Sequence, residues 1–522
     1  MSRRTLSLLT TVLLVTPLVV AACGATGATS TRDSARIAMA APATLDPAAA
    51  GDAATSAVIS QLFETLTTFD DSLTLRPALA ESWRSEQDGR RIVFHLRDGL
   101  TFSDGTPLRA TDVVRSWRRV IDPTSPSPLA TLLLDVRGAT AYLAGRGSAA
   151  NLGLTADDAG GDVIVDLERP ASDFPRIVAG PTFGIVPPDV GGDALRAGNG
   201  FVASGGYRAV SERATEMVLQ ANVRYWAGPP AITTVTLTTD LAGASPVDVF
   251  ERGDVDYVDI SEYDARWIGY DRTLGPQLRA TPSLSTFYFG FDTRTPPFDD
   301  VRVRQAFGAA VDWRRIATLD ALDAGSVANS MVPPGIPGRS DRDVLPAHDP
   351  ALGRRLLAEA GYAGGAGFPD VALVTSGSPY DRAVVAEVRR ELGITLRSET
   401  MDSDAYFARL DHDPPAIFGL AWIADYPGRN DFLGVLLGSD ATNDYGRWRS
   451  PAFDAAIADA GAATSDAAAA AAYDAAEDVV RSEVPVIPMS YGTGWALSRD
   501  GLLGAGQNGL GSLRLAGLAW DR

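Results

Sequence analysis

Side chains able to do nucleophilic, acid–base or metal chemistry are few and scattered in this chain. The three histidines, His95, His348 and His412, lie far apart and lack the spacing of metal ligands. The chain has no lysine, which excludes Schiff-base chemistry and a phosphate-binding P-loop. No residue stands in a known nucleophile or zinc motif, and no pair of carboxylates stands out. The sequence therefore gives no positive case for an enzyme, a cofactor or a metal site.

Cys23 is the only cysteine, and it follows a segment with the pattern of an export signal. Arg3 and Arg4 precede an apolar run over residues 6–20, and small residues lead into Cys23. This arrangement resembles the lipobox of bacterial lipoproteins, which implies a signal peptide over 1–22, lipidation of Cys23 and a tether over 23–33. A simple secretory peptide and a transmembrane anchor are the alternatives, although the run is short for a span. We expect an extracytoplasmic protein, anchored by lipid to the cell membrane in the cell envelope.

Length and charge restrict the class of protein further. The chain has 522 residues, is 45% hydrophobic and carries a formal net charge of −19. Removal of the leader leaves about 500 residues, more than one hydrophobic core supports, so two or three lobes are expected. An acidic chain has no electrostatic attraction to nucleic acid or anionic lipid headgroups. We therefore expect no nucleic-acid partner, and contact with a membrane only through the lipid.

Hydrophobic periodicity predicts strands and helices that alternate along much of the chain. Strands are predicted over residues 37–39, 92–96, 163–167, 217–220, 233–238, 287–291, 371–374, 394–397 and 417–420. Helices are predicted over residues 55–66, 111–120 and 302–311, and over an alanine-rich segment at 467–480. Asp112 is expected to interact with exposed N–H groups at the start of its helix. Alternating helices and strands after residue 351 favour an α/β lobe.

Two blocks of sequence carry a specific resemblance to a known family. Residues 94–114 read FHLRDGLTFSDGTPLRATDVV, and residues 297–307 read PFDDVRVRQAF. Weaker matches follow the same order along the chain, among them residues 45–47, 62–66, 225–228, 422–427 and 485–488. Together they resemble the family-5 extracellular solute-binding proteins, the oligopeptide, dipeptide and nickel receptors of ABC importers.

The resemblance implies a two-lobed α/β clamshell of the periplasmic-binding-protein kind, type II, with an extra subdomain in lobe I. Lobe I would cover residues 34–284, with the subdomain inserted at about 71–170. Lobe II would cover residues 285–484, and residues 485–522 would return to lobe I. In such receptors the ligand binds in the cleft between the lobes, and closure removes water so that polar contacts strengthen.

The resemblance also implies where a ligand would bind. Asp425 lies in a W-x-x-D-Y motif with Trp422 and Tyr426, and in peptide-binding relatives this aspartate pairs with the free α-amino group. The loop Gly51-Asp52-Ala53 aligns with a segment that offers main-chain hydrogen bonds to an extended peptide. Ser285 and Thr286, beside the first crossing between lobes, are weaker candidates. A structural turn or cap is the alternative role for Asp425.

Some positions depart from the family pattern. Asp292 stands where Asn is usual, and residues 428–430 replace a frequent Asp-Pro. The residue that would hold a ligand carboxylate is not identified, and Arg429 and Arg447 are the only suggestions. We predict a monomeric, lipid-anchored receptor that passes peptides to ABC permease transmembrane subunits. A nickel chelate, haem or glycan is the alternative ligand, and a secreted hydrolase is a remote alternative function.

Overall fold

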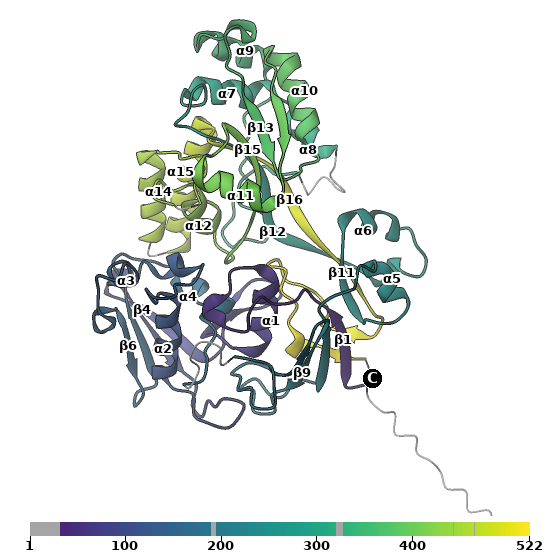
Figure 1. The fold of residues 1–522 in the computed structure, drawn as a ribbon. Coiled ribbons are helices and arrows are strands. Elements are labelled where there is room, and N and C mark those ends of the chain that lie inside the picture. Colours follow the sequence, from purple (N-terminus) through teal and green to yellow (C-terminus); the bar gives the residue numbers. More distant parts are fainter. Residues whose placement is uncertain (1–31, 189–194, 320–326, 442, 464, 522) are drawn as a thin grey trace, which may run out of the picture.

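Two lobes, one drawn above the other, make up the computed structural model (Figure 1). The structure describes residues 32–188, 195–319, 327–441, 443–463 and 465–521. Cys23 and the predicted signal peptide lie outside these ranges, so lipidation of Cys23 stays a prediction. Within the described ranges, no helix is long and apolar enough to cross a membrane.

Two long strands, β12 (Leu278–Phe291) and β16 (Val486–Ser498), pass from one lobe to the other (Figure 1). They are antiparallel partners in both lobes, and their register shifts between Pro282 and Thr286 and again between Phe287 and Tyr288. The first shift lies where the ladder leaves the lower lobe, lobe I, and enters the upper lobe, lobe II. This stretch is therefore the natural hinge, and we keep 284/285 and 484/485 as proposed limits of the lobes.

A large mixed sheet continues through both lobes in the order β14-β13-β15-β12-β16-β11-β1-β10-β9-β8. Its lobe I strands are β1 (Ser34–Ala38), β8 (Tyr207–Arg213), β9 (Glu216–Ala221), β10 (Thr234–Thr238) and β11 (Tyr257–Ile260). Its lobe II strands are β13 (Ala372–Thr375), β14 (Arg397–Thr400) and β15 (Ile417–Ile423). Buried apolar clusters cover both faces of the sheet in lobe II, which confirms the expected α/β class.

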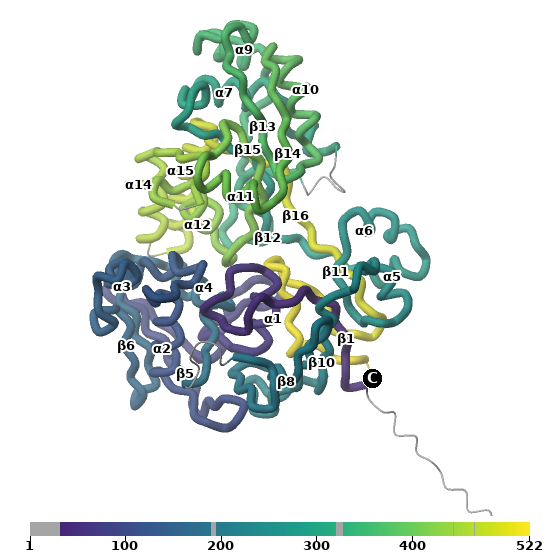
Figure 2. Tube along the Cα trace, in the orientation of Figure 1, coloured from purple at the N-terminus to yellow at the C-terminus, as the bar shows by residue number. Residues whose placement is uncertain are grey.

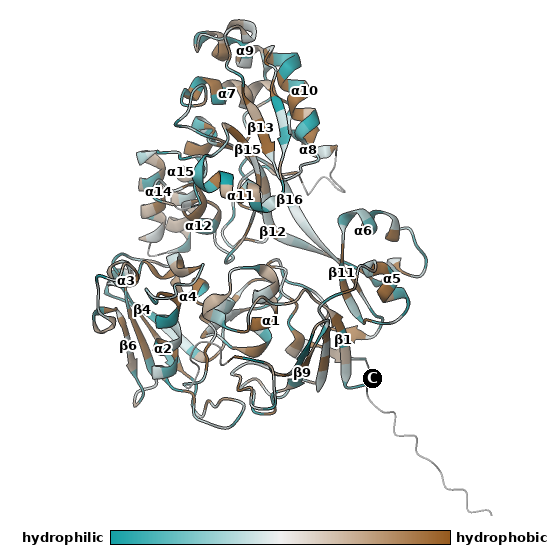
Figure 3. Ribbon diagram, viewed as in Figure 1, coloured by the Kyte–Doolittle hydropathy of each residue, from teal (hydrophilic) through white to brown (hydrophobic). Residues whose placement is uncertain are grey.

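Helices pack on this sheet through apolar faces, and their outer faces are polar. In Figure 3 the buried strand β13 is brown, and helix α10 beside it carries teal, hydrophilic residues. The helices of lobe I are α1 (Ala53–Leu62), α2 (Ala110–Val120), α3 (Ala139–Leu143), α4 (Phe174–Ile177), α5 (Pro246–Glu251) and α6 (Glu262–Ile268). The helices of lobe II are α7 (Val301–Ala310), α8 (Trp313–Thr318), α9 (Pro350–Glu359), α10 (Asp381–Leu392), α11 (Ser403–His412), α12 (Arg429–Phe432), α13 (Gly434–Leu437), α14 (Pro451–Gly461) and α15 (Asp466–Glu483).

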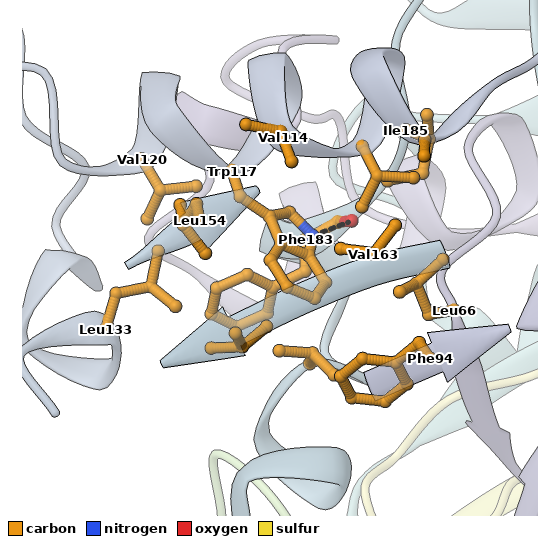
Figure 4. Close-up of a cluster of buried hydrophobic side chains, with 14 of the residues drawn as sticks. Leu66, Phe94, Val114, Trp117, Val120, Leu133, Leu154, Val163, Phe183 and Ile185 are labelled. Carbon is orange, nitrogen blue, oxygen red and sulfur yellow. Dashed lines mark hydrogen bonds between the residues drawn. The ribbon is translucent and has the colours of Figure 1, made fainter. Parts of the chain in front are cut away.

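A subdomain of lobe I has its own small sheet and its own core. The sheet has the order β4-β5-β7-β6, with bounds β4 (Ala80–Glu86), β5 (Arg91–Leu96), β6 (Leu154–Asp157) and β7 (Asp162–Asp166). Helix α2 covers it, and Asp112 accepts a hydrogen bond from the Arg109 backbone N–H at 2.9 Å, as a first-turn acid should. Trp117 on α2 fills the centre of this core (Figure 4).

The C-terminal segment returns to lobe I beside the N-terminal elements, as the yellow and purple tubes of Figure 2 show. Gln61 on α1 fixes this contact, because its side chain donates to the Leu513 carbonyl and accepts from the Leu515 N–H, each at 2.9 Å. Two short antiparallel pairs complete lobe I: β2 (Thr67–Phe69) with β3 (Leu75–Pro77), and β17 (Leu502–Leu503) with β18 (Ala519–Trp520).

Two of the predicted elements need correction. The helix expected over residues 55–66 ends at Leu62, because Phe63 leaves the helical conformation, although Leu66 is still buried. The strand expected over residues 394–397 begins at Arg397, as β14. Ile394 and Leu396 are buried in the connection before it. In both places the apolar pattern predicted the buried residues correctly, but it misplaced the end of the helix and the start of the strand.

The subdomain core predicts a large effect of Trp117→Ala. The indole is fully buried, donates to the Phe183 carbonyl, and contacts the rings of Phe94 and Phe174 edge-on. Its loss should lower the free energy of unfolding by about 3–5 kcal/mol, and Trp117→Phe should lower it by less. Urea unfolding followed by circular dichroism measures this, and a loss below about 1 kcal/mol for the alanine variant would contradict the packing.

Candidate functional site

The W-x-x-D-Y motif begins on the last residues of β15 and continues into the loop before α12. Trp422 pairs with Thr286 across β12, so their side chains lie on the same face of the sheet. The Trp422 indole Nε1 donates to Asp431 Oδ2 at 2.9 Å, and the Asp425 backbone N–H donates to the same oxygen at 3.2 Å. Asp431, at the start of α12, therefore holds both ends of the loop.

Asp425 is a half-buried carboxylate without a cationic partner among the described residues. Burial raises its pKa to about 6, since removal from water disfavours the charged form. A cation from a ligand would offset this cost. Binding of a ligand ammonium group at Asp425 stays a prediction.

Asp431 is a fully buried second carboxyl that the sequence did not single out. Its Oδ1 has no hydrogen-bond partner among the described residues. Burial, and then the neighbouring Asp425 carboxylate, raise its pKa well above the usual range. The only available signal was an aspartate six positions after Asp425, and nothing in that spacing predicts that the two groups meet.

Tyr426 points away from the open side of the loop. Its side chain is fully buried, and its hydroxyl accepts a hydrogen bond from Asn430 at 3.1 Å. Burial raises the pKa of this phenol well above its usual value, so it stays neutral. The structure gives Tyr426 the role of supporting the loop, and direct contact of its ring with a ligand stays a prediction.

The two suggested holders of a ligand carboxylate already have acidic partners. Arg429 is buried and forms ion pairs with Asp474 at 2.7 Å and Glu477 at 2.5 Å. Arg447 forms an ion pair with Asp292, one of the positions that depart from the family pattern. The Arg429 guanidinium is therefore closed to a ligand carboxylate, whereas Arg447 is partly exposed and a ligand role for it stays a prediction.

The edge of β15 is open where it approaches the motif. On that side β15 pairs with β13 only at Ile417 and Phe418 within the described chain. The next carbonyl, of Gly419, accepts from the Tyr406 hydroxyl at 2.7 Å. Ala421 and Ile423 are exposed. An extended chain could therefore add as a further strand along residues 421–423 and end at Asp425.

The loop Gly51-Asp52-Ala53 is exposed in lobe I. The Asp52 carboxylate caps α1, since it accepts from the Thr55 N–H at 2.8 Å and the Thr55 hydroxyl at 2.7 Å, and these bonds lower its pKa. The side chain is thus engaged within the loop. Main-chain contacts of these three residues with a ligand stay a prediction.

Ser285 and Thr286 point to opposite faces of β12. Ser285 pairs with the exposed Ile423 and is partly exposed itself. Thr286 is fully buried, and its hydroxyl donates to the Met331 carbonyl at 2.9 Å. Of these two hydroxyls, only that of Ser285 is placed to meet a ligand at the surface. A ligand role for either residue stays a prediction.

The lobes contact each other near the motif. Phe69 and Leu73 of lobe I pack into the same apolar cluster as Met331 and Phe432 of lobe II. A cavity of about 320 Å³ lies between the subdomain and lobe II. Its polar lining comes from both lobes: Asp135, Arg169, Ser172 and Asp173 from lobe I, and Asn430, Asp459 and Tyr473 from lobe II. Asn430 lines this cavity and Asp425 does not. The cavity therefore lies next to the segment that follows the motif, at Asn430.

Comparison with known proteins identifies the class that this fold and site define. Residues 74–444 match the model described as "Bacterial extracellular solute-binding proteins, family 5 Middle". The match covers more than half of the chain, which therefore belongs to family 5 of the bacterial extracellular solute-binding proteins, the receptors of ABC importers.

Individual relatives cover most of the chain. It is 29% identical over 468 residues to the probable deoxycholate-binding periplasmic protein YgiS of Escherichia coli K12, with 86% of each protein covered. It is 28% identical over 473 residues to the periplasmic oligopeptide-binding protein OppA of Salmonella typhimurium, with 86% of this chain and 84% of OppA covered. The solved structure of the Escherichia coli murein tripeptide binding protein MppA has a TM-score of 0.77 at 25% identity, with 95% of this chain and 100% of MppA covered. Each of these relatives is named as a binding protein, and the names of YgiS and OppA place those two in the periplasm.

The raised pKa of Asp425 predicts that Asp425→Asn changes the free energy of unfolding of the ligand-free protein, and that the change depends on pH. Because the folded protein holds this proton up to about pH 6 and the unfolded chain only to about 3.8, wild-type stability falls as pH rises from about 3.8 to about 6 and levels off above that. The variant should gain about 1–2 kcal/mol over wild type at pH 8 and nothing near pH 4. Thermal unfolding across this range measures the difference, and a gain that does not depend on pH would contradict the assignment.

Proposed function

We propose that this protein is a lipid-anchored receptor that captures peptides by their free α-amino group and delivers them to an ABC permease. One observation carries the proposal: Asp425 is half-buried, has no cationic partner in the part of the chain that the structure describes, and follows directly after the open edge of β15. A peptide added to this edge would bring a chain terminus to the carboxylate. The relatives named for oligopeptide and murein tripeptide binding support the same ligand class.

Charge also separates this ligand class from an anionic one. The Asp425 carboxylate lies beside the buried Asp431 carboxyl, and Asp173 of lobe I, whose own pKa is raised by burial, lies close to Asp431. Arg429, the nearest arginine along the chain, is already paired with Asp474 and Glu477. Deoxycholate, which the name of YgiS specifies, carries a carboxylate, and an acidic site would repel it. The Asp425 site therefore favours a cationic group over a bile-acid anion.

Peptide capture predicts that Asp425→Ala and N-acetylation of the ligand have the same effect. We expect trialanine to bind wild type, and either change to weaken binding by about ten- to a hundredfold, since a charge-assisted contact contributes about 1.5–3 kcal/mol. Isothermal titration calorimetry measures this. Asp413→Asn is a matched control on an exposed carboxylate of lobe II and should bind normally.

Two results would contradict the peptide assignment. One is equal affinity for trialanine and its N-acetyl derivative. The other is the absence of binding across a library of di- to pentapeptides, which would favour the nickel-chelate, haem or glycan alternative.

Membrane attachment through Cys23 predicts a change of location without a change of binding. Cys23→Ser should release or mislocalise the protein, because the acyl chains would be missing. The purified variant should bind trialanine like wild type, since Cys23 precedes the predicted tether. Fractionation with an antibody, followed by calorimetry, measures both properties. Retention of the variant in the membrane fraction would contradict the lipid anchor.

A further inference from the structure

Asp431 and Asp425 form a carboxyl pair in which only one group is partly exposed. Asp431 Oδ2 accepts two hydrogen bonds, from the Trp422 indole and the Asp425 N–H, and Oδ1 accepts none. An ionised Asp431 would leave a buried, partnerless oxygen with part of a negative charge. A proton on Oδ1 would remove that charge and leave Oδ2 as the acceptor for both donors.

Among the described residues, no cation forms an ion pair with Asp425 or Asp431. Asp173, before α4 of lobe I, raises the pKa of Asp431 further, while burial raises the pKa of Asp173 itself and Arg176 lies 3.7 Å from its carboxylate. Arg169 of lobe I pairs with Asp135 at 2.6 Å. Tyr426 and Tyr473 are phenols whose pKa values are raised by burial, so they are neutral at physiological pH. Arg429, on the same helix as Asp431, directs its guanidinium to Asp474 and Glu477 on α15. The missing positive charge has to come from a proton or from a ligand.

We propose that Asp431 carries a proton in the empty receptor and releases it when a ligand ammonium group binds at Asp425. The inference rests on the proposed function for the identity of the ligand. Before binding, the pair consists of one carboxylic acid and one carboxylate. After binding, it consists of two carboxylates and one ammonium group, and one proton has passed to solvent. Asp431 is thus a positioning residue, which orients Trp422 and Asp425, and also the group that couples capture to pH.

The exchange of the Asp431 proton for a ligand ammonium group accounts for the presence of this second buried acid beside Asp425. A ligand cation within a few ångströms favours ionisation of both carboxyls, and each unit by which it lowers a pKa corresponds to about 1.4 kcal/mol. Between pH 6 and the pKa of Asp431, affinity should rise with pH, because proton release accompanies binding. A receptor with one carboxylate at this place would lack that dependence.

Calorimetry of trialanine binding at pH 7.5, in buffers with different ionisation enthalpies, counts the protons released. Wild type should release a substantial fraction of one proton. Asp431→Asn, which keeps the size of the side chain and an oxygen for the Trp422 indole, should still bind but release close to none.

Asp444→Asn is the matched control. Asp444 is another buried acid of lobe II, its pKa is raised to about 7 by burial, and it lies beside Arg449. It should release as many protons as wild type. Equal release by wild type and Asp431→Asn, or no release by wild type, would overturn the inference.

Infrared spectroscopy tests the same proton without any ligand. The difference between wild type and Asp431→Asn at pH 7.5 should contain the carbonyl band of a neutral carboxylic acid. Absence of that band would overturn the inference whatever the ligand is. If the band is present and no peptide binds, the peptide assignment fails while the protonation of Asp431 stands.

Discussion

The pairing of β12 with β16 on both sides of the hinge is the constraint on which the rest of the structure depends. Both strands belong to the sheets of both lobes, so each lobe is built onto the same ladder. The lobe II half of β12 holds β15 in register from Ser285 to Phe291. This places the end of β15, and the loop with Asp425, close to the hinge. Opening and closing at the proposed hinge would therefore move lobe I relative to the proposed binding edge, which belongs to lobe II.

The candidate site is a place where local stability is lowered. Asp425 and Asp431 are carboxyls moved out of water without a positive charge among the described residues, whereas the buried Arg429 of the same lobe is paired with Glu477. A core built for stability alone would have an apolar or paired group here. A carboxylate without a cationic partner, in a loop beside an open strand edge, is a feature that the proposed ligand would complete.

Much of the fold could be predicted from the sequence, and the reasons differ between elements. Helix α2 has a strong apolar periodicity and a first-turn acid, and the structure places it within one residue of the prediction. The first half of β12 was missed, because Arg279 and Pro282 break the alternation and the ladder partner lies about two hundred residues away in β16. Asp425 was found only through the resemblance to a family. Asp431 was missed because its role depends on the turn into α12, which brings its side chain under Trp422.

A crystal structure of the receptor with a bound tripeptide tests the central claim most directly. We predict that the ligand's ammonium nitrogen lies within about 3 Å of an Asp425 carboxylate oxygen, and that its backbone forms strand-like hydrogen bonds with residues 421–423. A tripeptide bound elsewhere, or bound with its amino group turned away from Asp425, would contradict the account.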